Sequence, residues 1–204
     1  MLFRSAEVGE FEGEVTGVDF SPDGSLLAIS AQAGSAWVFA MPSGELQYEL
    51  VGHTGPVRRI RFSPDGTLLV TGSNDGTARV WSAKHGGLLH TLTGHTGPVY
   101  DVEFNPDGSL LATGSIDATI KLWSTADFGA NPLTLGGHRA GIYNIQFSPD
   151  GRRLISGSRD RTARVSAIDV DDLIEIAESR VTRPLNDAEC LRYLHVPMCP
   201  ADSG

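Results

Sequence analysis

The chain has 204 residues, of which 40% are hydrophobic and 20% charged, and its formal net charge is −9. This composition excludes a disordered chain or a coiled coil, and the 24 glycines and 11 prolines indicate many turns. No apolar run approaches the roughly 18 residues that a bilayer-spanning helix needs. The N-terminus turns acidic where a signal peptide would be apolar, and two cysteines cannot form a disulfide scaffold. We therefore expect a soluble, cytoplasmic, turn-rich globular protein.

The negative charge is unevenly distributed along the chain. Residues 1–50 carry eight acidic and one basic side chain, residues 51–168 carry nine and twelve, and residues 169–204 carry eight and three. Binding to nucleic acid or to an anionic membrane requires a basic surface, so the net charge argues against both as partners. The asymmetry also has an ordinary explanation as solvating charge.

A turn of the form Phe-Ser-Pro-Asp-Gly occurs four times, at 20–24, 62–66, 104–108 (with Asn for Ser) and 147–151. The intervals are 42, 42 and 43 residues, and in the last three copies a Gly-His pair precedes the turn and a Gly-Ser-x-Asp segment follows it. Pro-Asp-Gly supplies a fixed φ, a side chain that caps its own turn and a residue that adopts positive φ. Apolar runs flank each turn. Each unit therefore predicts four short strands, which is typical of a β-propeller blade.

The Gly-His start, the turn aspartate and the terminal tryptophan together resemble the WD-repeat family over about residues 1–168. The resemblance implies an all-β fold, a β-propeller of four WD-type blades in a partial or half ring. It also implies a hydrogen-bonded tetrad in each blade, in which Asp accepts from His, His bonds a hydroxyl and the hydroxyl meets an indole N–H. Such a relay leaves no buried polar group alone.

The tetrad positions are occupied differently in the four units. They hold His53, Thr71, Asp75 and Trp81 in the second unit, and His95, Thr113, Asp117 and Trp123 in the third. The fourth unit keeps His138, Ser156 and Asp160 but has Ser166 in place of Trp, and the first has Phe11, Ile29, Ala33 and Phe39. We expect apolar packing alone to hold the first blade.

A hydroxyl, a histidine and an aspartate also match the triad of a hydrolase. An enzyme needs one nucleophile, whereas a repeat fold needs one clamp in each blade, so three copies at one spacing favour the structural role. The sequence shows neither an oxyanion-hole motif nor a nucleophile elbow. We expect no enzymatic activity and no cofactor, with a hydrolase as the alternative.

The N-terminal segment bears on how the ring closes. A WD repeat usually begins with the outer strand of one blade and continues with three strands of the next. Within residues 1–9, the segment Leu2–Ser5 aligns with the outer-strand segment Leu88–Thr91. We therefore expect it to supply the outer strand that the last blade lacks.

Four blades are fewer than rings of this family usually have, so three arrangements fit. The chain closes alone, it ends a larger propeller, or two copies join as half-rings. The first unit is acidic, and residues 138–168 are basic through Arg139, Arg152, Arg153, Arg159, Arg161 and Arg164. Opposite charges on the two edges fit closure within one chain or between two. We hypothesise a homodimer of half-rings, with a fragment of a larger propeller as the alternative.

Residues 169–204 predict a tail of two short helices. The acids in 169–172 cap the start of the first helix, and Asn186 with Glu189 has the spacing of a capping box for the second, after a break at Pro184. The tail resembles the C-terminus of large bacterial WD-repeat signalling proteins, many of which carry a STAND-type ATPase domain ahead of the propeller. No P-loop or kinase motif is present in this sequence.

The tail also contains Cys190, His195 and Cys199, whose spacing resembles that of metal ligands. A closed zinc site takes four protein ligands, and only three are evident. A local disulfide is a second interpretation, which a reducing cytoplasm disfavours. We favour a third, that these are small buried residues that fix the end of the tail.

The resemblance implies a binding zone on the top surface of the propeller. It includes the residue five positions after each Gly-His histidine and the residue before each turn aspartate. These partner-binding candidates are Arg58, Tyr100 and Tyr143, with Thr16 in the first unit, and Asn74, Ile116 and Arg159. Tyrosine and arginine are enriched in interface hot spots, although such residues also occur as ordinary solvated loop side chains.

These features predict a non-catalytic scaffold or sensor module of a bacterial signalling protein that binds a protein or peptide partner. Two alternatives come from other classes of function. One is the hydrolase with a His, hydroxyl and Asp set. The other is nucleic-acid binding through the arginine-rich last unit, which the acidic tail disfavours.

Overall fold

The computed structural model describes residues 8–168, and within this range the chain forms fifteen β-strands and no helix. The strand expected at Leu2–Ser5 lies outside the described residues. The same holds for the two helices expected after residue 168 and for Cys190, His195 and Cys199. No helix in the described range has the length and apolar character that crossing a bilayer requires.

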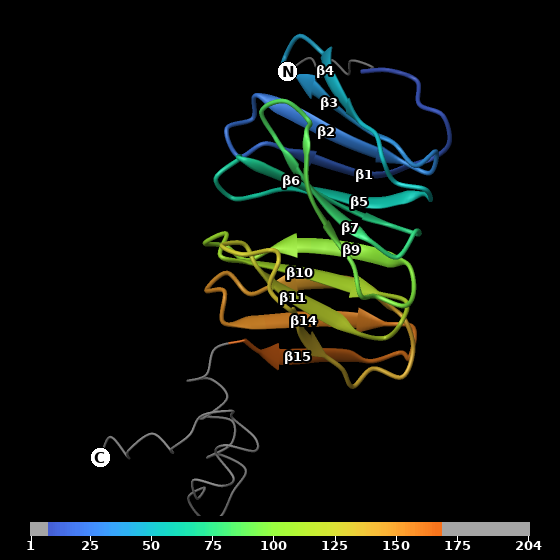
Figure 1. The fold of residues 1–204 in the computed structure, drawn as a ribbon, viewed down its shortest axis with the longest axis vertical. Coiled ribbons are helices and arrows are strands. Elements are labelled where there is room, and N and C mark those ends of the chain that lie inside the picture. The colour runs from blue at the N-terminus through green and yellow to red at the C-terminus, as the bar shows by residue number, and fades with distance from the viewer. Residues whose placement is uncertain (1–7, 169–204) are drawn as a thin grey trace, which may run out of the picture.

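The strands form four antiparallel sheets, each made of strands consecutive in the chain, which we call blades 1 to 4 (Figure 1). Blade 1 consists of β1 (Val15–Phe20), β2 (Leu26–Ala31), β3 (Ala36–Ala40) and β4 (Glu45–Leu50). Blade 2 consists of β5 (Val57–Phe62), β6 (Leu68–Ser73), β7 (Ala78–Ser82) and β8 (Leu88–Leu92). Blade 3 consists of β9 (Val99–Phe104), β10 (Leu110–Ser115), β11 (Ile120–Ser124) and β12 (Leu133–Leu135). Blade 4 consists of β13 (Ile142–Phe147), β14 (Arg153–Ser158) and β15 (Ala163–Ala167).

The blades are stacked in chain order, with the innermost strands β1, β5, β9 and β13 side by side. Blades 1 and 4 form the two ends of the stack, so the four blades make an open arc (Figure 1). The predicted all-β propeller of four blades is therefore confirmed in its partial-ring form. The last blade has three strands among the described residues, where the others have four.

The Pro-Asp-Gly segments form the turns between the first two strands of each blade, as the sequence predicts. In blade 2, the Asp65 carboxylate accepts hydrogen bonds from the Ser63 hydroxyl and, at 3.0 Å, from the Thr67 N–H. Gly66 adopts a φ of +70°, in the left-handed region that favours glycine. The turn thus reverses the chain within a few residues and sends β6 back beside β5.

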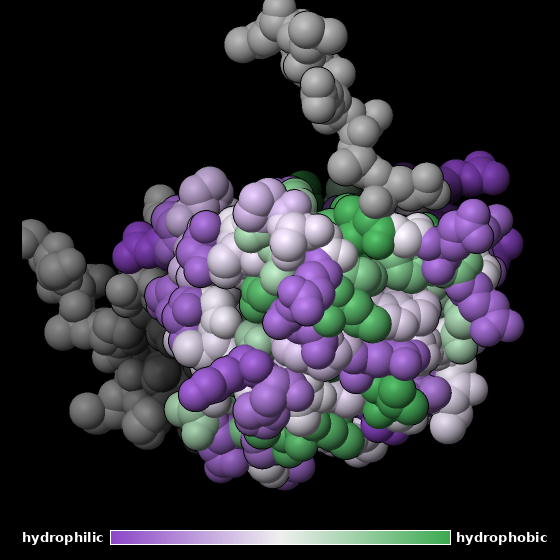
Figure 2. Space-filling model, turned by 90° about the horizontal axis from the view of Figure 1, so that it is seen from above, coloured by the Kyte–Doolittle hydropathy of each residue, from purple (hydrophilic) through white to green (hydrophobic). Residues whose placement is uncertain are grey.

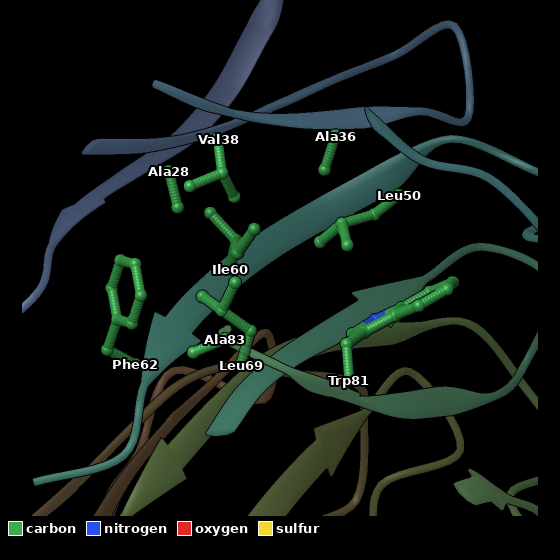
Figure 3. Packing of buried hydrophobic residues seen from close by; sticks show 9 residues of the cluster. All are labelled: Ala28, Ala36, Val38, Leu50, Ile60, Phe62, Leu69, Trp81 and Ala83. Atoms are coloured by element: carbon green, nitrogen blue, oxygen red, sulfur yellow. The ribbon is translucent and has the colours of Figure 1, made fainter. Parts of the chain in front are cut away.

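The hydrophobic core lies between blades. In the junction of blades 1 and 2, Val38 and Leu50 pack against Ile60, Leu69 and Trp81, all of them buried (Figure 3). Fully burying a side chain of this size contributes roughly 1.5–3 kcal/mol. The second and third strands of each blade are its central strands, and their side chains point alternately toward the preceding and the following blade. Every blade is therefore stabilised from both sides except at the ends of the arc.

Blade 1 has an apolar cluster where the other blades have a polar relay. Phe11 occupies the histidine position, and its ring lies 5.0 Å from that of Trp37 and 5.9 Å, edge-on, from that of Phe39. Ile29 is buried in the same cluster. Apolar packing therefore holds this blade, as we expected from its sequence.

Substitutions at the turn between the second and third strands test the backbone account. Ala118 has a φ of +69° at the position where Gly34 and Gly76 stand in blades 1 and 2. A Cβ in this conformation costs roughly 1–2 kcal/mol, partly offset by the higher entropy of glycine in the unfolded chain. We expect Ala118→Gly to raise the free energy of unfolding by about 0.5–1 kcal/mol in urea titrations. Gly76→Ala is the matched reverse change and is expected to lower it, and equal stability of both variants with the parent would contradict the account.

Candidate functional site

A continuous hydrogen-bond relay in blade 2 connects the loop before β5 to strands β6 and β7 and to the turn between them. His53 Nδ1 lies 2.7 Å from Asp75 Oδ2, and His53 Nε2 lies 2.8 Å from Thr71 Oγ1. Trp81 Nε1 donates to the same Thr71 oxygen at 2.9 Å. In blade 3 the relay is the same, with distances of 2.8, 2.9 and 3.1 Å between His95, Asp117, Thr113 and Trp123.

The surroundings of the relay fix its protonation. Burial lowers the pKa of His53 and of His95, although the partner aspartate opposes this. Burial disfavours the charge of Asp75, but hydrogen bonds from Thr77 and His53 outweigh it and lower the pKa of Asp75 to about 2. A neutral imidazole that donates through Nδ1 to an ionised carboxylate has a free acceptor at Nε2 for the Thr71 hydroxyl, whose oxygen then accepts from Trp81.

The burial of its hydroxyl groups favours a structural role of the relay over a catalytic one in blades 2 and 3. Thr71 and Thr113 are fully buried, and each oxygen already contacts a histidine and an indole. A nucleophile has to reach its substrate. The relay instead connects the loop before the first strand of a blade to its second and third strands.

Blade 4 has a shorter relay. His138 Nδ1 lies 2.9 Å from Asp160 Oδ2, and His138 Nε2 lies 2.9 Å from Ser156 Oγ. A hydrogen bond from the Thr162 side chain, with others from the neighbouring loop, lowers the pKa of Asp160. The partly buried Ser166 stands at the position of the tryptophan, so the last blade lacks the apolar contacts of that side chain.

The partner-binding candidates on the inner strands form one row across three blades. Arg58, Tyr100 and Tyr143 lie on β5, β9 and β13, and we call them the Arg58–Tyr143 row. The Arg58 guanidinium lies 5.0 Å from the centre of the Tyr100 ring, and the Tyr100 and Tyr143 rings are 5.3 Å apart at an angle of 70°. Arg58 Nε also donates to Asn74 Oδ1 at 2.9 Å. These are favourable cation–π and edge-to-face geometries, so the side chains hold one another in place.

The remaining candidates lie in the loops around this row or away from it. Ile116 packs on the loop before β13, where a Cβ added to Gly141 would lie 2.8 Å from its Cδ1. Arg159 is exposed, and its backbone N–H donates to the Gly141 carbonyl at 2.8 Å. Thr16 is not part of the row, because its hydroxyl donates to the Val57 carbonyl at 2.6 Å between blades 1 and 2.

One residue beneath the row was not singled out from the sequence. Asp101 is 1% exposed, and its carboxylate accepts from Arg59 Nε at 2.7 Å and from the Ile145 N–H at 2.8 Å. It also accepts from Asn144 Nδ2 at 3.2 Å. One carboxylate thus joins blades 2, 3 and 4 directly beside the row. The only sequence signal is that these three polar residues share one position of the repeat.

An open groove of about 380 Å³ lies at the other end of the inner strands. It is lined by the prolines of the Pro-Asp-Gly turns and by the residues just before them, including Arg61, Glu103 and Gln146. Arg61 Nε and Glu103 Oε2 are 3.2 Å apart, and burial raises the pKa of Glu103 although Arg61 opposes this. Among residues 8–168, no three His, Cys, Asp or Glu side chains are placed to hold a metal ion.

Comparison with known proteins agrees with the repeat geometry. A protein-family model described as "WD domain, G-beta repeat" matches residues 5–39, 44–82, 86–124 and 129–165. The last three matches each run from the outer strand of one blade through three strands of the next, for example from β4 to β7. Comparison with curated proteins found no match.

The relay is tested by removal of its central hydroxyl. Thr71→Val keeps the volume of the side chain but leaves Trp81 Nε1 and His53 Nε2 without their partner. An unpaired buried polar group costs about 1–3 kcal/mol, so we expect a loss of that size in the free energy of unfolding, measured in urea. Thr91→Val, at an exposed position of β8, is the matched control and is expected to change stability by less than about 0.5 kcal/mol. A Thr71→Val variant as stable as this control would disprove the role of the relay.

The relay also predicts how stability depends on pH. The pKa values of His53 and His95 lie below the ordinary 6.5 in the folded protein, and those of Asp75 and Asp117 are about 2 instead of 3.8. In both cases the unfolded chain binds protons more readily, so acidification favours unfolding. We expect the urea midpoint to fall as pH decreases from 7 through 6.5, and again below 4. A midpoint that rises between pH 7 and pH 5 would contradict this.

Proposed function

This chain belongs to the WD40 repeat family, whose domains generally act as protein-interaction scaffolds, and from that premise we propose that it binds a protein or peptide partner through the Arg58–Tyr143 row. The observation that carries the proposal is the mutual packing of Arg58, Tyr100 and Tyr143 across three blades. These three residues come from three separate repeats of the sequence, and their side chains contact one another in the folded chain.

The row is suited to binding because it is ordered before a partner arrives. Arg58 is held by Asn74 and by the Tyr100 ring, and Asp101 fixes the spacing of the inner strands beneath it. Tyr143 is 43% exposed, so part of its ring remains open to contact. Side chains that are already fixed lose little conformational entropy on binding, which is why rigid aromatic and arginine residues dominate hot spots.

The chemistry of the row indicates a class of partner. Two tyrosine rings offer apolar faces with polar hydroxyl tips, and the Arg58 guanidinium lies beside them. We propose a peptide segment that presents an apolar side chain beside a carboxylate. A carboxylate pairs well with a guanidinium, and the apolar group gains from burial against the rings.

We propose further that the chain is a non-catalytic module of a bacterial signalling protein and acts in the cytoplasm. The resemblance of the tail supports the signalling context, and the net charge of −9 argues against nucleic acid and membrane as partners. The buried hydroxyls of Thr71 and Thr113 argue against a hydrolase. We also propose that further blades complete the ring, either in a homodimer of half-rings or in a larger propeller.

A selection of peptides tests the row directly. Peptides chosen from a random 12-residue display library on the parent chain are measured by fluorescence anisotropy against Arg58→Glu/Tyr143→Ala. We expect at least a tenfold weaker affinity, because loss of a hot-spot side chain costs roughly 2 kcal/mol or more. The thermal melt is expected to stay unchanged.

A matched control separates the row from exposed residues in general. Leu89→Ala changes a residue of β8 that is 47% exposed, and we expect it to leave peptide affinity unaltered. Peptides that bind the double variant as tightly as the parent would remove the row as the binding site.

A further inference from the structure

The inner strand of each blade carries three apolar residues, which pack against the preceding blade in blades 2, 3 and 4. Ile60, Val102 and Ile145 occupy the middle position and are at most 2% exposed, whereas Val18 in blade 1 is 54% exposed. The last position shows the same difference, with Phe62, Phe104 and Phe147 at 7% and Phe20 at 56%. Val15 completes the exposed set in blade 1, 49% exposed. We call Val15, Val18 and Phe20 the leading face.

Blade 4 exposes the apolar surface that in blades 1 to 3 packs against the following blade. Val80 is buried by the following blade, whereas Val165, at the equivalent position of β15, is 66% exposed. Ile155 is 44% exposed, although its counterpart Val70 in blade 2 is fully buried. We call Ile155, Gly157 and Val165 the trailing face.

A glycine shows what the trailing face is shaped to receive. A Cβ at Gly72 would lie 3.0 Å from side-chain atoms of both Val99 and Val102, so this glycine makes room for the next blade. A Cβ at Gly114 would lie 3.1 Å from a side-chain atom of Ile145 and 3.2 Å from one of Ile142. A Cβ at Gly157 would have no neighbouring atom within 4 Å. The trailing face therefore has the space beside Gly157 that two β-branched side chains fill at the other glycines. The leading face has such a pair of side chains, Val15 and Val18, which pack against no preceding blade.

We infer that the leading face of one copy of this chain packs on the trailing face of a second copy, and the reverse, so that two open arcs close into one ring of eight blades. The inference is independent of the Arg58–Tyr143 row, and it rests on the proposal above that further blades complete the ring. Each copy carries both faces, so a two-fold rotation satisfies all four at once. Closed propellers of up to eight blades are well known, and closure covers the apolar ends. Figure 2 looks onto the end of the stack that blade 1 forms and shows apolar patches there among polar residues.

Charge complementarity favours a second copy as the occupant. The segment that leads into β1 is acidic, with Glu10, Glu12 and Glu14 exposed. Blade 4 has six exposed arginines, Arg139, Arg152, Arg153, Arg159, Arg161 and Arg164, and two aspartates in residues 138–168. Opposite charges on the two ends of one chain attract head to tail, while two identical ends repel each other.

Light scattering behind a sizing column tests the assembly on the full chain. We expect a mass twice the 21.7 kDa of one chain. Val18→Glu on the leading face and Val165→Glu on the trailing face each damage both junctions of the ring, and we expect each variant to run at the mass of one chain. Leu89→Glu, on the 47% exposed residue of β8, is the matched control and is expected to keep the double mass.

A mixture of the two variants distinguishes head-to-tail contact from any other dimer. A pair of Val18→Glu and Val165→Glu chains retains one undamaged junction, between the trailing face of the first and the leading face of the second. We expect the mixture to recover the double mass at higher concentration, whereas neither variant does so alone.

The outcomes decide the inference. A parent chain with the mass of a monomer at all concentrations overturns it and leaves closure to further blades of a longer protein. A dimer that only one of the two substitutions dissociates also overturns it, because like faces would then be in contact. If a variant fails to give the cooperative urea transition of the parent, the mass of the parent chain still decides.

Discussion

The packing of one blade's inner strand on the central strands of the preceding blade is the interaction on which this structure depends. The Ile60, Val102 and Ile145 positions are almost completely buried by it, and each junction repeats the same contact. Stacking in this way determines the curvature of the arc and aligns the inner strands, and so places Arg58, Tyr100 and Tyr143 in one row. It also leaves one apolar face exposed at each end of the arc, because the first blade has no preceding blade and the last blade has no following one.

The polar relays serve a different purpose from the packing between blades. His53, Thr71, Asp75 and Trp81 connect strands and a loop within one blade, and they hold the loop that leads into the inner strand. Blade 1 shows that apolar contacts replace this device, since Phe11 and Phe39 pack where a histidine and a tryptophan stand elsewhere. The relay therefore fixes the form of a blade, and the stacked apolar faces determine how blades assemble.

Much of this was predictable because it is local or repeats at one spacing. The Pro-Asp-Gly turns, the strands beside them and the relay partners all follow from residues within one unit, as does the apolar replacement at Phe11. The bridge from Asp101 to Arg59 and Asn144 was not predictable, because it depends on three blades lying side by side. For the same reason the contact between Arg58 and the Tyr100 ring could not be predicted, although both residues were candidates for partner binding. The strand at Leu2–Ser5 and the tail with Cys190, His195 and Cys199 stay predictions.

The central claim is that the two ends of the arc are complementary and cover each other between copies. Hydrogen exchange of the backbone amides, measured on the full chain over a range of concentrations, tests it most directly, because burial of an end suppresses its local opening. The account predicts that exchange in β1, β14 and β15 slows as concentration rises, while the interior strands β6 and β10 exchange at a constant rate. Exchange in β1, β14 and β15 that is independent of concentration would contradict it.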